Sequence, residues 1–168
     1  MAVALLVSAI AGFADTIDDD PEAVSQYARA KRLLREGDYL EASRIFERLS
    51  GRFPGSPNID LFLYHRAKAD YHFGDYAKAA AGFANFTARF PASPMVPYAI
   101  FFQANIDYSR GNVDRAVEKW IQAYGDSEDP RLNDLVTSSL TAAITNAESV
   151  RMSPADFRTV PVGKRCDL

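Results

Sequence analysis

Two histidines and two aspartates in the middle of the chain are the side chains whose types and spacing could do chemistry. His65 and His72 are seven residues apart, so a helix would put them on one side but two turns apart, which is about 10 Å. That distance is too long for one metal ion to bridge without other ligands. Asp70 and Asp107 stand at equivalent positions of an internal repeat and could form a general acid–base pair.

The two aspartates lack the companions that catalysis requires. The sequence shows no nucleophile or oxyanion donor beside them, no glycine-rich phosphate loop, no Cys/His pair and no serine-hydrolase elbow. The single cysteine, Cys166, excludes an intramolecular disulfide and a cysteine-rich zinc site. We therefore predict that the protein is not an enzyme and that it uses no metal and no cofactor.

Composition indicates an ordinary folded protein with a protein or peptide as its partner. The 168 residues suffice for one domain or one short repeat array, and a hydrophobic content of 48% is enough for a continuous core. The net charge of −3 gives no reason to expect nucleic acid or an anionic membrane surface as a partner.

The elements that carry these side chains follow a repeat of 37 residues. Its clearest marks are three glycines: Gly37, Gly74 and Gly111. An alanine follows each glycine by five residues and an aromatic residue follows by nine: Ala42, Ala79 and Ala116, then Phe46, Phe83 and Trp120. An aromatic residue precedes each glycine by ten residues and an alanine by seven: Tyr27, Tyr64 and Phe101, then Ala30, Ala67 and Ala104. Such self-similarity is typical of repeat architectures.

Each repeat is predicted to form two helices with the glycine at the turn between them. Aromatic and small residues recur at helical spacing before the glycine and again after it. The second helix should end at Phe53 or Phe90, since each is followed by a proline that cannot continue the helix. Ser56 and Ser93, each followed by proline, are expected to begin the next helix as N-caps.

We therefore predict an all-α fold, an α-solenoid of three helix pairs with a C-terminal capping helix. The repeat domain spans 22–150 and divides as follows: repeats at about 22–56, 57–93 and 94–129, and a capping helix at 130–150. The capping helix is expected because position 148 lacks the glycine of a fourth unit, while Leu135, Ile144 and other apolar residues keep helical spacing. Residues 151–168 are predicted to form a tail.

The N-terminus has two interpretations. An apolar run from Val3 to Ile10, with small Gly12 and Ala14 after it, favours a secretory signal peptide over 1–14, followed by an acidic segment over 15–21. No lysine or arginine precedes the run, so a short buried helix in a cytoplasmic protein is the alternative. The run is too short to span a membrane, and no cysteine follows it to carry a lipid anchor.

These patterns resemble the tetratricopeptide repeat family over about 100 residues, from 24 to 124. The family's order of small, aromatic, glycine, alanine and proline positions matches the second unit: Ala67, Tyr71, Gly74, Ala79, Phe83, Phe86 and Pro91. Phe86 stands where the family usually has a small residue, and the unit is three residues longer than the usual 34. The extra length falls in the connector between units.

The connectors, Arg-Phe-Pro-x-Ser-Pro at 52–57 and 89–94, resemble those of bacterial envelope repeat proteins. Two such proteins are the periplasmic cell-division coordinator of the Tol-Pal system and the repeat lipoprotein of the outer-membrane β-barrel assembly machinery. The chain departs from the coordinator in having no N-terminal coiled coil and from the lipoprotein in having no lipidation cysteine. The resemblance implies a periplasmic scaffold that binds other envelope proteins. Alternatives are a helical arm of a peptidoglycan-remodelling enzyme system and a cytoplasmic adaptor.

The family resemblance also implies a partner-binding groove, because the first helix of each pair lines a concave surface in that family. Carried over by position, the groove would hold Tyr27, Lys31, Arg35, Tyr64, Lys68, Tyr71, His72, Phe101, Asn105 and Tyr108, with Leu34 and Ser109 beside them. Aromatic rings flanked by lysine and arginine suit a peptide with acidic groups. Alternatively, rings such as Tyr64 and Tyr71 pack between repeats.

Overall fold

The computed structural model describes residues 20–151, and helices and short connectors account for this whole part of the chain. The helices are α1 Pro21–Glu36, α2 Tyr39–Arg52, α3 Ile59–Phe73, α4 Tyr76–Arg89, α5 Val96–Ser109, α6 Val113–Gly125 and α7 Pro130–Arg151. No strand occurs within the described range. The predicted all-α fold is confirmed. The expected signal peptide and most of the acidic segment lie in 1–19, and the expected tail lies almost entirely in 152–168, outside the described residues.

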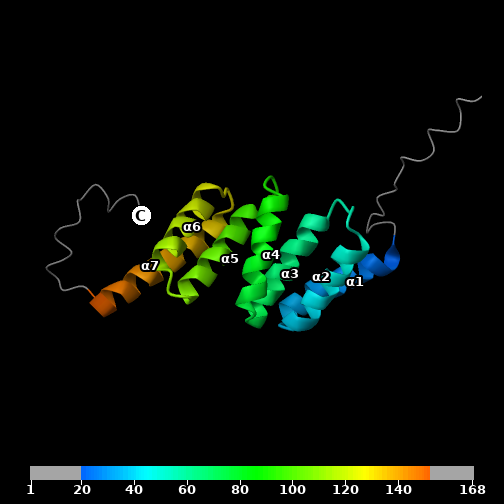
Figure 1. The fold of residues 1–168 in the computed structure, drawn as a ribbon, viewed down its shortest axis with the longest axis horizontal. Helices are drawn as coiled ribbons and strands as arrows, with labels where there is room; N and C mark the ends of the chain where they lie inside the picture. Colours follow the sequence, from blue (N-terminus) through cyan, green and yellow to red (C-terminus); the bar gives the residue numbers. More distant parts are fainter. Residues whose placement is uncertain (1–19, 152–168) are drawn as a thin grey trace, which may run out of the picture.

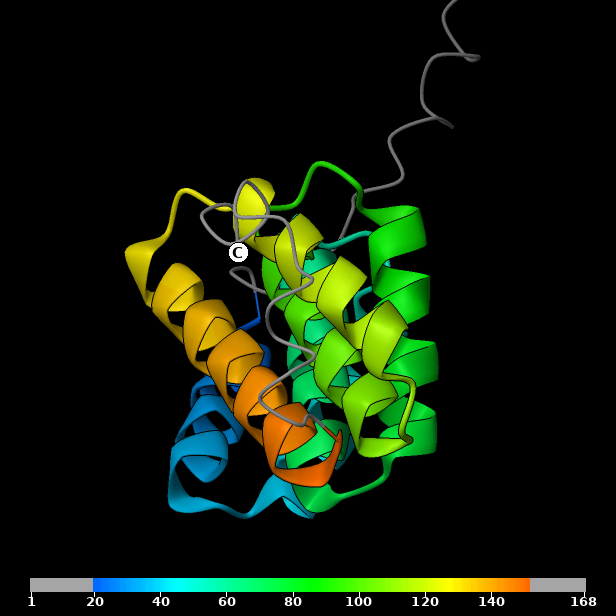
Figure 2. The ribbon, with the colours of Figure 1, turned by 90° about the vertical axis from the view of Figure 1, so that its left-hand side faces the viewer.

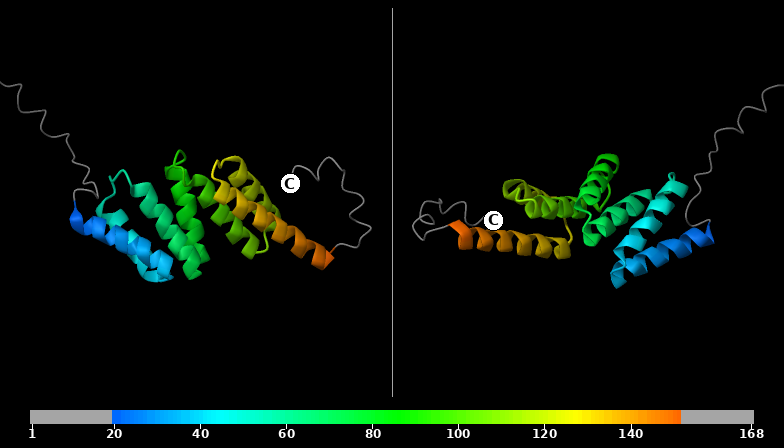
Figure 3. Two further views of the ribbon diagram at one scale, coloured as in Figure 1. Left: turned by 180° about the vertical axis from the view of Figure 1, so that it is seen from behind. Right: turned by 60° about the horizontal axis from the view of Figure 1, so that its bottom comes forward.

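The helices stack in chain order from one end of the molecule to the other (Figure 1). Each helix packs against the one before it and the one after it, and α3 also touches α5 in the next unit. The pairs α1–α2, α3–α4 and α5–α6 are the three predicted units. α7 lies across the open end of the stack, where the end-on view shows it in orange (Figure 2). Views from behind and below show the same succession (Figure 3). This is the predicted tetratricopeptide-like solenoid.

The turn inside each unit depends on its glycine. Gly37, Gly74 and Gly111 have φ angles of 88°, 95° and 80°, a left-handed conformation that side chains with a Cβ rarely adopt. At Gly74 the backbone amide donates to the carbonyls of Asp70 and Tyr71, which closes the last turn of α3. The glycines therefore end α1 and α3 and lead the chain directly into the second helix of each pair.

Small residues let the helices cross closely. All six repeated alanines are buried: Ala30, Ala42, Ala67, Ala79, Ala104 and Ala116. At the crossing of α3 and α4, a Cβ added to Gly82 would lie 2.9 Å from the Cβ of Ala67, so even one methyl group is excluded there. The rings of Phe46, Phe83 and Trp120 fill the space between units.

The connectors confirm where helices end but not where they begin. α2 and α4 end just before Phe53 and Phe90, as predicted. α3 and α5 start two residues later than expected, because the Ser-Pro segment forms a turn instead of the first helical residues. In that turn the Ser56 hydroxyl oxygen accepts a hydrogen bond from the Asn58 amide, and the Ile59 amide donates to the Ser56 carbonyl. The serines cap a turn that precedes the helix.

The capping helix forms with a narrower apolar stripe than predicted. α7 begins at Pro130, and Asp129 caps it by accepting a hydrogen bond from the Arg131 amide. Leu132 and Val136 are buried against the rest of the solenoid. Leu135 and Ile144, expected on the same stripe, are 49% and 45% exposed because only α6 packs extensively against this helix.

Candidate functional site

A histidine lies beneath two lysines on the side of the molecule formed by α1 and α3. The Lys31 ammonium donates to Nε2 of His65 at 2.9 Å, across the boundary between the first two units. Because Nε2 accepts this bond, the neutral ring carries its proton on Nδ1. That Nδ1 is buried and has no hydrogen-bond partner within the described residues, and the His65 residue is only 8% exposed.

The charges in this cluster are all of one sign. Burial, followed by the charges of Lys31 and Lys68, lowers the pKa of His65 to about 3, so the ring is neutral at pH 7. Burial also lowers the pKa of Lys68, and burial together with the charges of Lys68 and Arg35 lowers the pKa of Lys31. No ion pair among the side chains of residues 20–146 involves Lys31, Arg35 or Lys68. The cluster is therefore a half-buried positive site without a carboxylate.

Aromatic rings surround the cluster and hold it in place. The Lys68 ammonium lies 5.8 Å from the ring centroid of Phe102, a residue of α5. Tyr71 packs on the same ring, with centroids 4.9 Å apart. The His72 ring stacks on Tyr39 at 5.1 Å, which joins α3 to the start of α2. These contacts form a rigid aromatic surface beside the lysines.

Five of the ten predicted groove residues come together here. Lys31, Lys68 and Tyr71 are half-buried, while Arg35 and His72 are exposed. We call the surface over α1, α3 and the adjoining part of α5 that holds these five residues and His65 the first-helix face. It offers cations and rings from two successive units, arranged in the order of the repeat.

Two further predicted residues do not reach this surface. Tyr64 is 3% exposed, and its ring packs against Phe83 and Phe86 in the core. Phe101 is 6% exposed. Both side chains are buried in the hydrophobic core, so neither is available to a partner. For these two residues the groove prediction is corrected in favour of the alternative, packing in the core.

The remaining three predicted residues are occupied by contacts inside the molecule. The Tyr27 ring packs against Phe46 and Phe62, between the first two units. The carbonyl oxygen of the Asn105 side chain accepts a hydrogen bond from Trp120 Nε1 at 2.8 Å. Tyr108 packs against the Trp120 ring, and its hydroxyl accepts a hydrogen bond of 3.0 Å from a side chain of α7. All three are half-buried, and their contacts hold helices together within a unit or between neighbouring elements of the stack.

The sequence did not reveal the three residues that contact the lysines and rings of the first-helix face: His65, Phe102 and Tyr39. His65 entered only as half of a metal pair with His72, although it precedes Lys68 by three residues and so shares a helical side with it. Phe102 directly follows the repeat position of Phe101, and Tyr39 stands two residues after the turn glycine Gly37. The contacts of their rings with Lys68, Tyr71 and His72 depend on how the helices are angled in space. Only the spacing of His65 and Lys68 gave a signal in the sequence.

The side chains with catalytic potential have structural roles. Asp70 accepts a hydrogen bond of 2.6 Å from the Ser43 hydroxyl of α2, and Asp107 pairs with Lys119 of α6 at 2.6 Å. Both carboxylates are buried, Asp70 with a partner in the preceding unit and Asp107 with a partner in its own unit. Among the side chains described, those of residues 20–146, no three histidine, cysteine or acidic residues gather closely enough to hold a metal ion.

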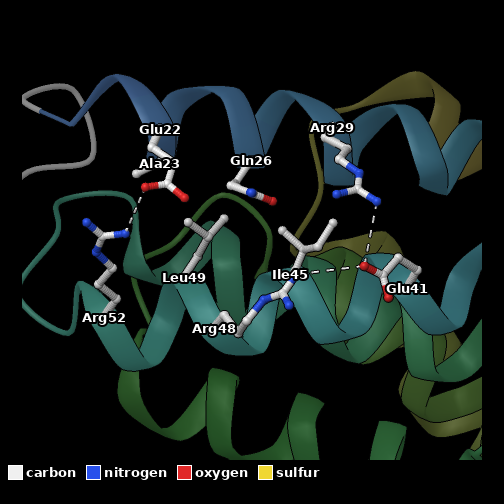
Figure 4. A pocket seen from close by; sticks show the side chains of 9 residues that line it. All are labelled: Glu22, Ala23, Gln26, Arg29, Glu41, Ile45, Arg48, Leu49 and Arg52. Carbon is white, nitrogen blue, oxygen red and sulfur yellow. Dashed lines mark ion pairs between the residues drawn. The ribbon is translucent and has the colours of Figure 1, made fainter.

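A separate hollow of about 480 Å³ lies at the N-terminal end, between α1 and α2. Figure 4 shows the long side chains that cross it: Glu41 pairs with Arg29 and Arg48 at 3.8 and 3.7 Å, and Glu22 pairs with Arg52 at 3.7 Å. These cations are already paired with acids. The polar residues give this end of the stack a solvent-facing surface.

Comparison with known proteins places the fold within a family. A search of curated proteins gives no match to this chain. None of the helices within 20–151 has the length and apolar character needed to cross a bilayer. The YfiO family, described as outer membrane lipoprotein, matches residues 19–148, which include nearly the whole described solenoid. The chain therefore belongs to the YfiO family of outer membrane lipoproteins.

Proposed function

We propose that this protein is a non-catalytic scaffold of the bacterial cell envelope that binds an acidic segment of a partner protein on its first-helix face. Membership of an outer membrane lipoprotein family supports an exported protein with an envelope role. The solenoid supports binding as opposed to catalysis, since its buried carboxylates are engaged in packing between helices. The connectors add a resemblance to two envelope systems that assemble or coordinate protein complexes.

The observation that carries the proposal is the lack of a carboxylate beside Lys31 and Lys68. Lys119, by contrast, is also half-buried and pairs with Asp107 at 2.6 Å, which is how this chain stabilises a partly desolvated ammonium. Lys31 instead rests on a neutral histidine and Lys68 on an aromatic ring. A carboxylate from outside would gain charge-assisted hydrogen bonds there without any loss of existing ion pairs.

The repeat suggests how a partner chain would lie. Lys31 and Lys68 occupy the same position of successive units, so a segment crossing the first-helix face from α1 to α3 meets both lysines. Tyr71 and His72, which both pack against the buried ring of Phe102, continue this surface and offer rings to apolar side chains of the same segment. The partner motif we expect is therefore one or two acidic residues followed by an aromatic or aliphatic residue.

The test is affinity capture from solubilised bacterial envelopes, followed by titration of the captured protein. The charge-reversal variant Lys31→Glu with Lys68→Glu should lose the partner or bind it at least about tenfold more weakly, and raised salt should weaken the wild-type complex. The matched control is Arg48→Glu with Arg115→Glu, which makes the same change in net charge at exposed sites of α2 and α6.

Equal loss of binding in the control would show that net charge, and no particular face, is what the partner recognises. Unchanged binding in the Lys31 and Lys68 variant would overturn the proposal. Circular dichroism of both variants checks that the helices remain folded. The identity of the captured protein also decides between the two envelope systems that the connectors resemble.

A further inference from the structure

A second hollow, distinct from the first-helix face, lies where the second connector meets the third. It measures about 660 Å³ and is lined by residues 91–98 and 126–129. Its walls are largely apolar on the side of the second connector and the start of α5, including Met95, Val96 and the ring of Tyr98. The third connector forms the other wall, with Asp126 and Glu128 exposed on it.

The first two connectors each place a phenylalanine inside the fold. Phe53 is 4% exposed and belongs to the core of the first two units. Phe90 packs against the cores on both sides of its connector. In each case the preceding arginine lies over the ring, with Arg52 and Arg89 both 5.2 Å from the ring centroid. An Arg-Phe pair is therefore the element with which this chain closes a junction between units.

The third connector has no such pair. Six residues, 90–95, join α4 to α5, whereas four residues, 126–129, join α6 to α7. The residues that follow α6 are Asp126 and Ser127, and the nearest aromatic residue, Tyr124, is 51% exposed. The junction is tied instead by the Tyr98 hydroxyl, which donates to Asp129 at 2.5 Å. Ser127 stands at the repeat position of Phe53 and Phe90, and it lines the hollow.

The charge of the third connector is opposite to that of the first two. Asp126 stands at the repeat position of Arg52 and Arg89, and Glu128 follows two residues later. Neither acid takes part in an ion pair among the described residues. A cation brought by another chain would therefore meet carboxylates that are exposed and unpaired with any base. We propose that this hollow binds a partner segment in which a basic residue precedes an aromatic residue. The ring enters the hollow, and the cation pairs with Asp126 and Glu128.

The chain itself supplies the probe. A fluorescent peptide with the sequence of residues 87–94 contains Arg89 and Phe90 in their native order. Fluorescence anisotropy with the full chain should show saturable binding that weakens about tenfold or more when the peptide carries Phe90→Ala or Arg89→Glu. Failure of the native peptide to bind, or equal binding of the Phe90→Ala peptide, would overturn the proposal.

Two changes in the protein locate the site. Glu128→Lys should weaken the peptide about tenfold, whereas Glu118→Lys, an exposed glutamate of α6 outside the hollow, should leave binding unchanged. Replacing residues 126–129 with the second connector, 90–95, should fill the hollow and abolish binding. Equal effects of Glu128→Lys and Glu118→Lys on peptide binding would contradict the placement of the peptide in this hollow. This comparison remains valid even if the connector replacement does not fold. Binding lost only in Lys31 and Lys68 variants would place the peptide on the first-helix face and so refute this site.

Discussion

The buried histidine of the first-helix face should make stability fall steeply with acid. His65 has a pKa of about 3 in the folded chain, against an ordinary value of 6.5 for histidine, because burial and the two lysines oppose its protonation. Below about pH 6.5 the His65 ring therefore binds a proton in the unfolded chain but stays neutral in the folded chain until about pH 3. The free energy of unfolding must decrease as the pH falls through this window, and the decrease must level off near pH 3.

The size of the effect follows from the shift. Each pKa unit corresponds to about 1.4 kcal/mol, so the contribution of His65 between pH 6.5 and pH 4 is about 3 kcal/mol. That loss is a large part of the stability of an ordinary small domain, about 5–15 kcal/mol. His72 contributes in the same direction, since burial and then Lys68 lower its pKa as well.

The assay is urea unfolding of the wild type and His65→Gln at pH 7, 5.5 and 4. The amide oxygen of glutamine can accept the Lys31 hydrogen bond but does not titrate. The wild type should lose about 3 kcal/mol more than the variant across this range, and acids elsewhere cancel in the comparison. A difference between the two proteins that is constant with pH would refute the reasoning. So would an NMR titration in which the His65 ring protonates above pH 5.

Two further predictions test the packing of the solenoid. Gly74→Ala should destabilise the fold by about 1–2 kcal/mol because its φ of 95° is left-handed, whereas Gly51→Ala, helical with nothing near its added Cβ, should be neutral or gain up to about 1 kcal/mol. Ala67→Leu should cost about 1–3 kcal/mol or more at its tight crossing, whereas exposed Ala84→Leu should change stability by less than about 0.5 kcal/mol. Chemical denaturation measures all four, and equal costs within either pair would contradict the packing described.

Much of the fold could be predicted because the residues that end its helices and form its turns act locally. A glycine at each turn and an alanine at each crossing are dictated by backbone geometry, so their 37-residue period was enough to place the helix pairs. The starts of α3 and α5 were misplaced because Ser56 and Ser93 cap equally well a turn or a helix. The turn is distinguished from a helix only by the backbone hydrogen bonds in the structure, in which the Ile59 and Val96 amides donate to the Ser56 and Ser93 carbonyls.

The candidate site could be predicted only in part because repeat position does not fix which way a ring points. Tyr64 and Tyr71 lie on one predicted stripe, yet the first is buried in the core and the second reaches the surface. Lys31 and Lys68 were recognisable as charges without a packing role. His65 was not, because its significance depends on a lysine 34 residues earlier that only the stacking of α1 on the second unit brings within 2.9 Å.

The most direct test of the central claim is site-specific photo-cross-linking in the native envelope. A benzoylphenylalanine at position 72 would report on the first-helix face, and one at position 115 on α6 away from it. We expect a protein adduct from position 72 that disappears when Lys31→Glu and Lys68→Glu are added, and no adduct of that mass from position 115. The same adduct from both positions, or an adduct at position 72 that survives the charge reversal, would contradict that claim.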